Sequence, residues 1–202
     1  MGGGAPEGFL PAVLAGLAQL SRMGSGELSI ADSQMRLAGQ VLAASAAPEV
    51  EAELKRAVEP AFALETAIEV APPAPPVDTA ACSRLVADLL GRGTVRFASG
   101  RADIDRASRG LLDRMAAALL RCPSAAVRIV GHTDGVGDGE QNQRLSQARA
   151  NAVLAYLTAS GIGSDRLSAA GQGAGQPLAP NDTEAGRALN RRIEIEVKER
   201  AP

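Results

Sequence analysis

The two side chains best suited to ligand chemistry in this sequence are Asp134 and Arg149, which carry opposite charges. Asp134 stands at the end of a predicted strand, and Gly135, Gly137 and Gly139 follow it at every second position. Because glycine tolerates positive φ, such a loop folds tightly and brings its amides close to a ligand. The carboxylate and the guanidinium can therefore frame one small site of both charge signs.

Each of these residues also has a purely structural explanation. Aspartate is common in turns and at strand ends, so Asp134 also fits a turn residue. Arg149 lies one helical turn after Leu145, on or beside an apolar stripe, and burying an unpaired charge is very costly. Arg149 therefore needs a partner, which is Asp134, a backbone carbonyl or a ligand.

A strand and a helix must position these side chains. The strand is predicted over Ala126–Gly131. The helix is predicted to begin near Asn142, a good N-cap, and to run to about Ser160, where Gly161 can end it. Its apolar stripe at helical spacing consists of Leu145, Ala148, Ala152, Val153, Tyr156 and Leu157.

The remaining residues do not have the spacing of other kinds of site. A calcium loop starting at Asp134 would place Val136 and Leu145 at ligand positions, where neither can coordinate a metal. Gly171-x-Gly173-x-Gly175 departs from a dinucleotide fingerprint, and no helix follows it directly. His132 has no cysteine or serine motif beside it, and no carboxylate pair is arranged for glycosidase work. We therefore predict a binding protein, not an enzyme, with no metal and no cofactor.

The composition is that of an ordinary globular protein. Of 202 residues, 46% are hydrophobic and 22% charged, whereas only 2% are aromatic, which predicts aliphatic, alanine-rich cores. The net charge of −2 argues against general nucleic-acid binding. No apolar run reaches the ~18–20 residues that span a bilayer. Phe9–Leu20 lacks the preceding basic region of a signal peptide and is interpreted as an amphipathic helix.

A proline-rich linker over residues 72–81 divides the chain into two predicted domains, residues 5–71 and 82–198. The first domain is predicted to contain two helices and three strands: helix Glu7–Ser21, strands Glu27–Ile30 and Gln34–Val41, helix Ala47–Val58 and strand Leu64–Val70. This order resembles a BON domain, a small α/β module of bacterial envelope proteins. The alternative is an unrelated α+β module.

The second domain alternates strands and helices, which predicts an α+β two-layer sandwich. Besides the strand and helix described above, it contains strand Thr94–Phe97, helix Ile104–Arg121, strand Arg166–Ala170, a short helix and strand Ile193–Val197. Asn181 and Glu184 have the spacing of a capping box for the short helix.

A longer pattern in the second domain resembles the OmpA-like peptidoglycan-associated domain. Its motif positions are Thr133-Asp134, Gly137, Asn142, Leu145-Ser146, Arg149-Ala150, Gly161, Arg166-Leu167, Gly171, Gly173, Pro177, Asn181, Gly186-Arg187 and Asn190-Arg191-Arg192. The resemblance covers roughly Cys82–Lys198 and implies a βαβαβ-type fold with a mixed sheet.

The resemblance also implies a ligand, the diaminopimelate of the peptidoglycan stem peptide. The aspartate matching Asp134 binds its ammonium, and the arginine matching Arg149 binds its carboxylate, as charge and guanidinium geometry favour. The residues that would line or brace the pocket are Asn142, Leu145, Asn190 and Arg191. Many relatives have an acidic residue directly after the phenylalanine of the first strand, whereas Ala98 stands there here. Ser99 and Gly100 remain candidates because such contacts partly use backbone groups.

Cys82 and Cys122 are either buried thiols or a pair. Some relatives carry a cysteine pair at these places, so the resemblance favours a disulfide, which implies an oxidising compartment. We predict a periplasmic or outer-membrane protein whose domain anchors the outer membrane or an envelope complex to the cell wall. Contact with a membrane would come only through further segments or through envelope protein partners. The alternatives are an envelope hydrolase acting on peptidoglycan and a stator- or secretion-type interaction module.

Overall fold

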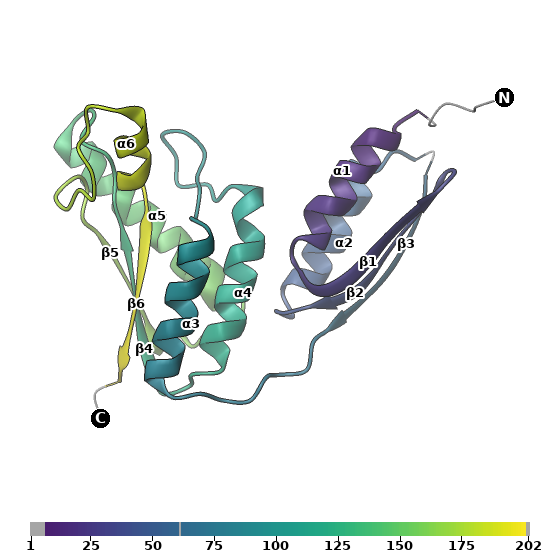
Figure 1. The fold of residues 1–202 in the computed structure, drawn as a ribbon, viewed down its shortest axis with the longest axis horizontal. Helices are drawn as coiled ribbons and strands as arrows, with labels where there is room; N and C mark the ends of the chain where they lie inside the picture. The colour runs from purple at the N-terminus through teal and green to yellow at the C-terminus, as the bar shows by residue number, and fades with distance from the viewer. Residues whose placement is uncertain (1–6, 61, 201–202) are drawn as a thin grey trace. The chain divides into compact units, whose positions relative to one another are not determined.

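The computed structural model describes residues 7–60 and 62–200 (Figure 1). Its contacts divide the chain into two compact units, with the division between Pro72 and Pro73. Residues 5 and 6 of the first predicted domain lie outside the described residues. Each unit is described on its own below.

The first unit has the predicted order of elements. These are α1 (Phe9–Leu20), β1 (Met23–Ala31), β2 (Gln34–Val41), α2 (Ala46–Ala57) and β3 (Ala63–Val70). Strand β2 lies in the middle of the sheet, antiparallel to β1 and parallel to β3. Strand β1 is longer than predicted, because it begins at Met23 and includes Gly24 and Gly26.

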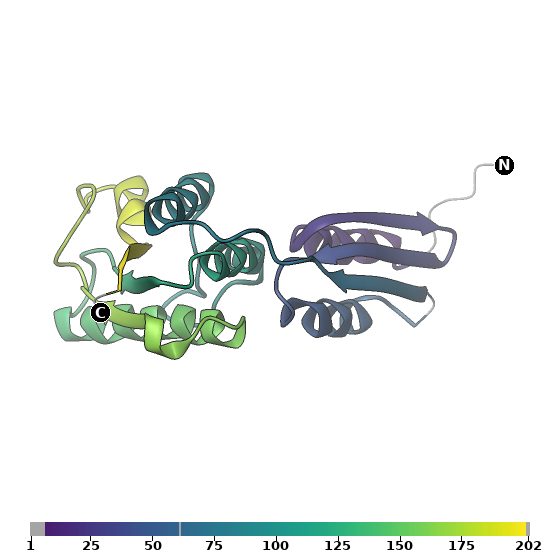
Figure 2. The ribbon, with the colours of Figure 1, turned by 90° about the horizontal axis from the view of Figure 1, so that it is seen from below.

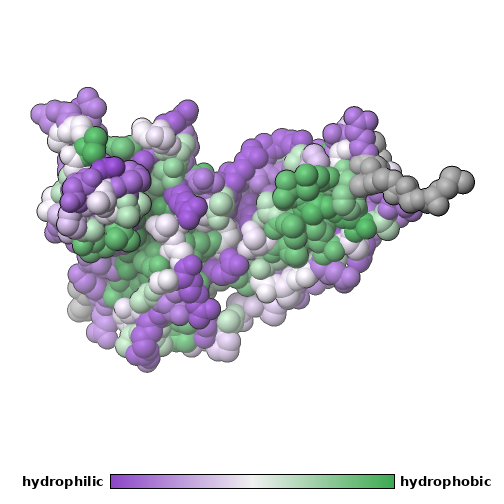
Figure 3. All heavy atoms as spheres, turned by 45° about the horizontal axis from the view of Figure 1, so that its top comes forward, coloured by the Kyte–Doolittle hydropathy of each residue, from purple (hydrophilic) through white to green (hydrophobic). Residues whose placement is uncertain are grey.

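Both helices of the first unit pack on one face of its sheet (Figures 1 and 2). Alternate residues of β2, including Met35 and Leu37, are buried against Leu54 and its neighbours. Helix α1 is less amphipathic than predicted, because Leu10, Leu14 and Leu17 are exposed on its outer side and form an apolar patch (Figure 3). The element order agrees with the prediction, whereas membership of the BON family stays a prediction.

The second unit is a two-layer arrangement around a mixed sheet. Its elements are α3 (Thr79–Arg92), η1 (Arg106–Ser108), α4 (Arg109–Leu120), β4 (Ala125–Gly131), α5 (Gly139–Ala159), η2 (Ser164–Arg166), β5 (Leu167–Gly171), α6 (Glu184–Asn190) and β6 (Ile193–Glu199). The strand order is β5-β4-β6, with β4 parallel to β5 and antiparallel to β6. Val127 and Ile129 are buried on the face of the sheet that the helices cover. Arg128 and Glu196 form an ion pair on the opposite face.

The predicted strand at Thr94–Phe97 is not formed. In the described part of this segment, only Phe97 pairs, in an isolated bridge with Ile104. The loop bonds instead to itself and to the start of α4: the Ala98 N–H donates to the Asp103 carbonyl at 3.0 Å, and the Arg96 N–H donates to Ser108 Oγ at 2.8 Å. These local partners satisfy the backbone without a sheet.

Four helix starts of the second unit differ from the prediction. Helix α4 begins at Arg109 and not at Ile104, because Ile104 pairs with Phe97 and η1 comes before the helix. The other three starts are set by the side chains that cap them. Helix α5 begins at Gly139, where Asp138 accepts a hydrogen bond from the Gln141 N–H, so Asn142 lies inside the helix. Helix α6 is capped by Thr183 and not by Asn181. Helix α3 begins at Thr79, inside the predicted linker, because Asp78 accepts from the Ala81 N–H at 2.6 Å. Helix α5 ends as predicted, at Gly161 with φ of +97°.

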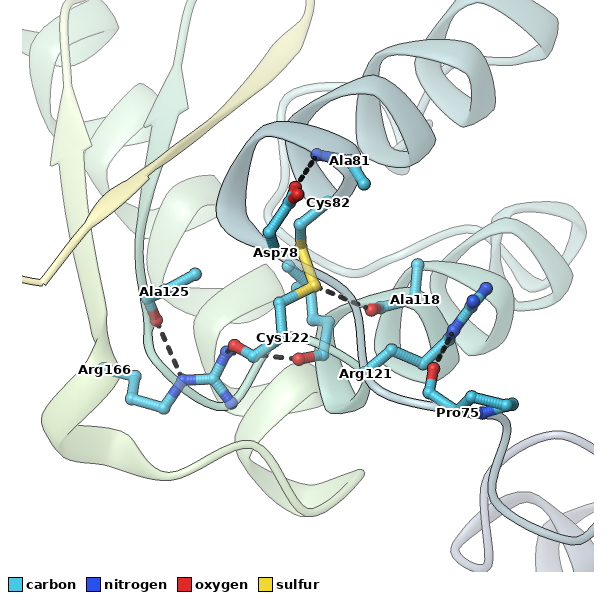
Figure 4. Close-up of a disulfide and its surroundings, with 10 residues drawn as sticks. Pro75, Asp78, Ala81, Cys82, Ala118, Arg121, Cys122, Ala125 and Arg166 are labelled. Atoms are coloured by element: carbon cyan, nitrogen blue, oxygen red, sulfur yellow. Dashed lines mark hydrogen bonds between the residues drawn. A yellow bond between two sulfur atoms is a disulfide. The ribbon is translucent and has the colours of Figure 1, made fainter.

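The start of the second unit is held to the end of α4. Cys82 and Cys122 form a disulfide, both fully buried, with Cα atoms 6.1 Å apart (Figure 4). Beside it, Arg121 Nε donates to the Pro75 carbonyl at 2.9 Å. Arg166 donates to three carbonyls at and after the end of α4, those of Leu119, Cys122 and Ala125. The predicted linker residues from Pro73 onward therefore belong to the second unit.

Candidate ligand-binding site

The second unit contains an open cavity of about 830 Å³ beside the ends of β4 and α6. Seven of the eight predicted ligand-binding residues line it: Ser99, Gly100, Asp134, Asn142, Leu145, Arg149 and Arg191. They come from the loop after Phe97, the loop after β4, helix α5 and the end of α6. The structure thus brings together segments that are far apart in the sequence.

Asn190 is the exception, because it is fully buried and does not line the cavity. Its side-chain oxygen accepts from the N–H groups of Leu178 and Ala179, and its amide donates to the Ala179 carbonyl and to Asn181 Oδ1. Asn181 in turn accepts from the Gly135 N–H at 3.0 Å. Asn190 therefore braces the loop beside the cavity and is not positioned to contact a ligand.

Arg149 reaches the cavity from a buried position on α5, where 7% of the residue is exposed. Its Nε donates to the Arg101 carbonyl at 3.0 Å, and its guanidinium lies 5.1 Å from the centre of the Phe97 ring. Burial, followed by repulsion from Arg191, lowers the pKa of Arg149, whereas Asp134 raises it. The guanidinium of arginine is ordinarily protonated throughout the physiological pH range.

The buried face of α5 is rotated relative to the predicted stripe. Ser146 and Ala150 are fully buried, whereas Ala148 is exposed. Ser146 is buried because its carbonyl lies against Gly131 of β4, where any larger residue would overlap it. This close approach of strand to helix positions the loop that carries Asp134 relative to Arg149.

Asp134 is paired with Arg191, a contact that was not predicted. Its Oδ2 accepts from Arg191 Nη1 at 2.7 Å, and its Oδ1 accepts from the Val136 N–H at 3.1 Å. The Asn142 amide donates to the Val136 carbonyl at 3.0 Å and so holds the same loop against α5. Arg191 shares the alternation of Ile193 and Ile195, which predicts a place at the inner end of the last strand. This prediction is wrong, because Arg191 follows α6 and precedes β6.

Helix α6 adds two charged residues to the cavity that sequence reasoning missed, Glu184 and Arg187. Glu184 accepts hydrogen bonds from Arg191 Nη2 and from Arg187, and the bond from Arg191, followed by that from Arg187, lowers the pKa of Glu184. The pKa of Arg191 is raised by its bonds to Asp134 and then to Glu184. The signal was the spacing of Glu184, Arg187 and Arg191 at three and four positions, along the short helix and the residue that follows it.

Replacing Gly131 by alanine is expected to lower the free energy of unfolding of the second unit by about 1–3 kcal/mol. The added methyl group would overlap the Ser146 carbonyl, which is part of the α5 backbone and cannot move alone. Gly139→Ala is the matched control, since no atom lies within 4 Å of its added Cβ and alanine suits a helix. Chemical unfolding of both variants tests this, and equal losses of stability would contradict it.

His132 is buried next to this site and has a lowered pKa. Desolvation is the main cause, followed by repulsion from Arg192. Glu194 raises the pKa of His132 instead, and its Oε2 lies 3.6 Å from His132 Nε2. The unfolded chain therefore binds a proton at higher pH than the folded protein does. Stability rises with pH wherever the unfolded state binds more protons.

Lowering the pH from about 7.5 to about 5.5, through the ordinary histidine pKa of about 6.5, is therefore expected to destabilise the wild type. His132→Gln, which cannot take up this proton, should lose less stability over the same interval. Thermal unfolding at both pH values measures the two slopes. Identical slopes in wild type and variant would show that His132 does not carry this dependence.

Among residues 7–60 and 62–200, no group of three or more His, Cys, Asp or Glu side chains is arranged to hold a metal ion. In the same described ranges, no helix has both the length and the apolar character needed to cross a membrane.

Comparisons with known proteins find a family model and several relatives that match this chain. A model of the OmpA family matches residues 96–191. The chain is 38% identical over 107 residues to outer membrane porin F of Pseudomonas fluorescens, a match that covers 53% of this chain and 33% of that protein. It is 39% identical over 129 residues to the peptidoglycan-binding protein ArfA of Mycobacterium tuberculosis, covering 63% of this chain and 39% of ArfA. The chain thus spans well under half the length of these relatives.

A solved structure extends the comparison to the fold. The peptidoglycan-associated lipoprotein from Burkholderia pseudomallei is 31% identical to this chain and superposes with a TM-score of 0.51. The match covers 55% of this chain and 93% of that protein. The second unit of this chain is an OmpA-like domain.

Proposed function

We propose that the second unit is a non-catalytic peptidoglycan-binding domain that recognises diaminopimelate in the stem peptide. The observation that carries the proposal is the guanidinium of Arg149, buried but open to the cavity. Within residues 7–60 and 62–200, its single hydrogen bond is the one from Nε to the Arg101 carbonyl. Both Nη groups are thus available to a ligand, and a carboxylate matches their planar fork.

The other end of the ligand would lie at Asp134. This carboxylate is 15% exposed on its side chain and borders the same cavity. A carboxylate has about four acceptor positions, so its bonds to Arg191 and to the Val136 N–H leave room for a ligand ammonium. Diaminopimelate carries an ammonium and a carboxylate on one carbon, which suits an acceptor and a fork that border one cavity.

The relatives support peptidoglycan as the polymer. ArfA is named as a peptidoglycan-binding protein, and the superposed structure is a peptidoglycan-associated lipoprotein. The disulfide supports an oxidising compartment such as the periplasm, because cytosolic thiols are normally kept reduced. We therefore place the native protein in the bacterial envelope, where it anchors the outer membrane or an envelope complex to the wall.

Incubation with purified sacculi tests the function itself. We expect the protein to sediment with the sacculi and to release no soluble muropeptides. Release of muropeptides would contradict a purely binding role and favour an envelope hydrolase. A protein that does not sediment with sacculi but captures an envelope protein would favour an interaction module.

A stem peptide with lysine in place of diaminopimelate is expected to bind about tenfold or more weakly. Lysine keeps the ammonium but lacks the side-chain carboxylate, and a charge-assisted hydrogen bond contributes about 1.5–3 kcal/mol, where ~1.4 kcal/mol is a factor of ten. Calorimetric titration of the two peptides measures the difference. Equal affinities would show that the carboxylate is not recognised.

We also propose that the first unit is a separate BON-like domain. Its order of α1-β1-β2-α2-β3 supports this assignment. Limited proteolysis next to Pro72, where the two units divide, should release two fragments, of which the second alone sediments with sacculi. Sedimentation of the first fragment would contradict the division of roles.

A further inference from the structure

Four charged side chains at the cavity form a chain of alternating sign. Asp134 accepts from Arg191 Nη1 at 2.7 Å, and Arg191 Nη2 lies 2.5 Å from Glu184 Oε1. Glu184 also pairs with Arg187 at 3.0 Å. A single guanidinium therefore bridges two carboxylates, one at the end of β4 and one at the start of α6.

The two carboxylates differ in exposure. The side chain of Asp134 is 15% exposed, whereas that of Glu184 is 68% exposed. Arg191 lies between them with 36% exposure. Asp134 is thus the more buried partner of Arg191, whereas Glu184 is largely exposed to solvent.

We propose that Arg191 is a resident counter-ion of Asp134, which competes with the ammonium of the ligand, and that Glu184 weakens this competition by holding Arg191 from the other side. The inference rests on the proposed recognition of diaminopimelate and concerns how the same site is regulated. It assigns Arg191 a role opposite to that of a residue that helps to hold the ligand.

The geometry makes the competition direct. An ammonium bonded to Asp134 Oδ2 would lie within about 5.5 Å of Arg191 Nη1, which bonds the same oxygen. Two cations at this separation repel each other, and near a protein surface the effective dielectric constant is well below that of water. The lowered pKa of Arg149 has repulsion from Arg191 as its second cause, so Arg191 already acts unfavourably on a neighbouring cation.

Glu184 is a second carboxylate partner for Arg191, besides Asp134. When an ammonium occupies Asp134, Arg191 can keep its bond to Glu184 through Nη2 and lose only the bond through Nη1. Without the charge of Glu184, Arg191 would bind Asp134 alone. Glu184 is therefore a positioning residue for Arg191 and need not touch the ligand.

The test is calorimetric titration of a diaminopimelate-containing stem tripeptide against the full chain. Arg191→Met is expected to bind the tripeptide about five- to tenfold more tightly than wild type. The charge-assisted bond from Arg191 to Asp134, which competes with the ligand ammonium, is absent in this variant. Arg191→Lys, whose single ammonium cannot bridge two carboxylates, should fall between them. The same tripeptide with its side-chain amino group acetylated should show no gain with either variant.

The coupling between Glu184 and Arg191 is measured with the Glu184→Gln variant. In the wild-type background it should weaken binding about threefold, and in the Arg191→Met background it should have no effect, because Glu184 acts through Arg191. An equal loss in both backgrounds would overturn its role as a positioning residue. Arg144→Gln is the control for charge removal: it is exposed on α5, pairs with Glu140 and lies outside the cavity lining.

The outcomes separate this inference from the proposed function. If wild type binds the tripeptide, Arg149→Ala weakens it, and Arg191→Met fails to tighten binding, only the competition is overturned. Weaker binding by a folded Arg191→Met or Arg191→Lys variant would likewise overturn it. If wild type does not bind, or Arg149→Ala binds equally well, the proposed site itself is wrong.

Discussion

Replacing Arg149 by alanine should weaken binding of the diaminopimelate peptide by about tenfold or more. The variant loses the guanidinium that would bond the ligand carboxylate, and each charge-assisted hydrogen bond is worth about 1.5–3 kcal/mol, with ~1.4 kcal/mol equal to a factor of ten. Arg149→Lys should not restore full affinity, because an ammonium cannot reproduce the bidentate fork. Calorimetric titration with the same peptide measures both variants.

A matched control separates lost recognition from lost charge. Arg144 stands on the same helix, is 67% exposed on its side chain and pairs with Glu140, so Arg144→Ala removes one positive charge outside the cavity. Arg149 also bonds the Arg101 carbonyl and lies over Phe97, so thermal unfolding must show that the variant remains folded. Equal affinities of wild type and a folded Arg149→Ala variant would place the site elsewhere.

Reduction of the disulfide should lower the free energy of unfolding of the second unit by roughly 3–4 kcal/mol. The bridge joins cysteines 40 positions apart and so restricts a long loop of the unfolded chain. Chemical unfolding with and without reductant measures the difference. Alkylation of the native, oxidised protein followed by mass spectrometry should find no free thiol.

The double variant Cys82→Ala/Cys122→Ala is the control for this measurement. It has no bridge to reduce, so its stability should not depend on the reductant. Two alkylated cysteines in the native, oxidised protein would contradict the disulfide. An unchanged stability after complete reduction would contradict its energetic role.

The sequence by itself determined most elements and pointed to the two charged residues at the centre of the candidate site. Hydrophobic periodicity and the glycine at position 161 predicted helix α5 and its end, since these signals are local. The opposite charges of Asp134 and Arg149 indicated that the two could frame one site, and both line one cavity. The bonded partner of Arg149 is one of the alternatives left open, a backbone carbonyl, that of Arg101. The motif resemblance brought Asn142, Leu145, Ser99 and Gly100 to the same place.

Competing local partners explain where sequence reasoning failed. Thr94–Phe97 has the composition of a strand, but nearby groups such as Ser108 Oγ satisfy its backbone. Asn142 and Asn181 are good caps, yet Asp138 and Thr183 take that role. Several polar residues stood close to each helix start, and local sequence does not say which one the chain path favours.

Only the tertiary structure decided which charges meet. Arg191 and Asp134 are 57 positions apart, and Arg149 and the Arg101 carbonyl are 48 apart. Such contacts depend on where β4, α5 and α6 come together, and that is set by packing such as the approach of Gly131 to Ser146. Charge type and helical spacing show that an ion needs a partner, whereas the packed backbone determines which partner lies within reach.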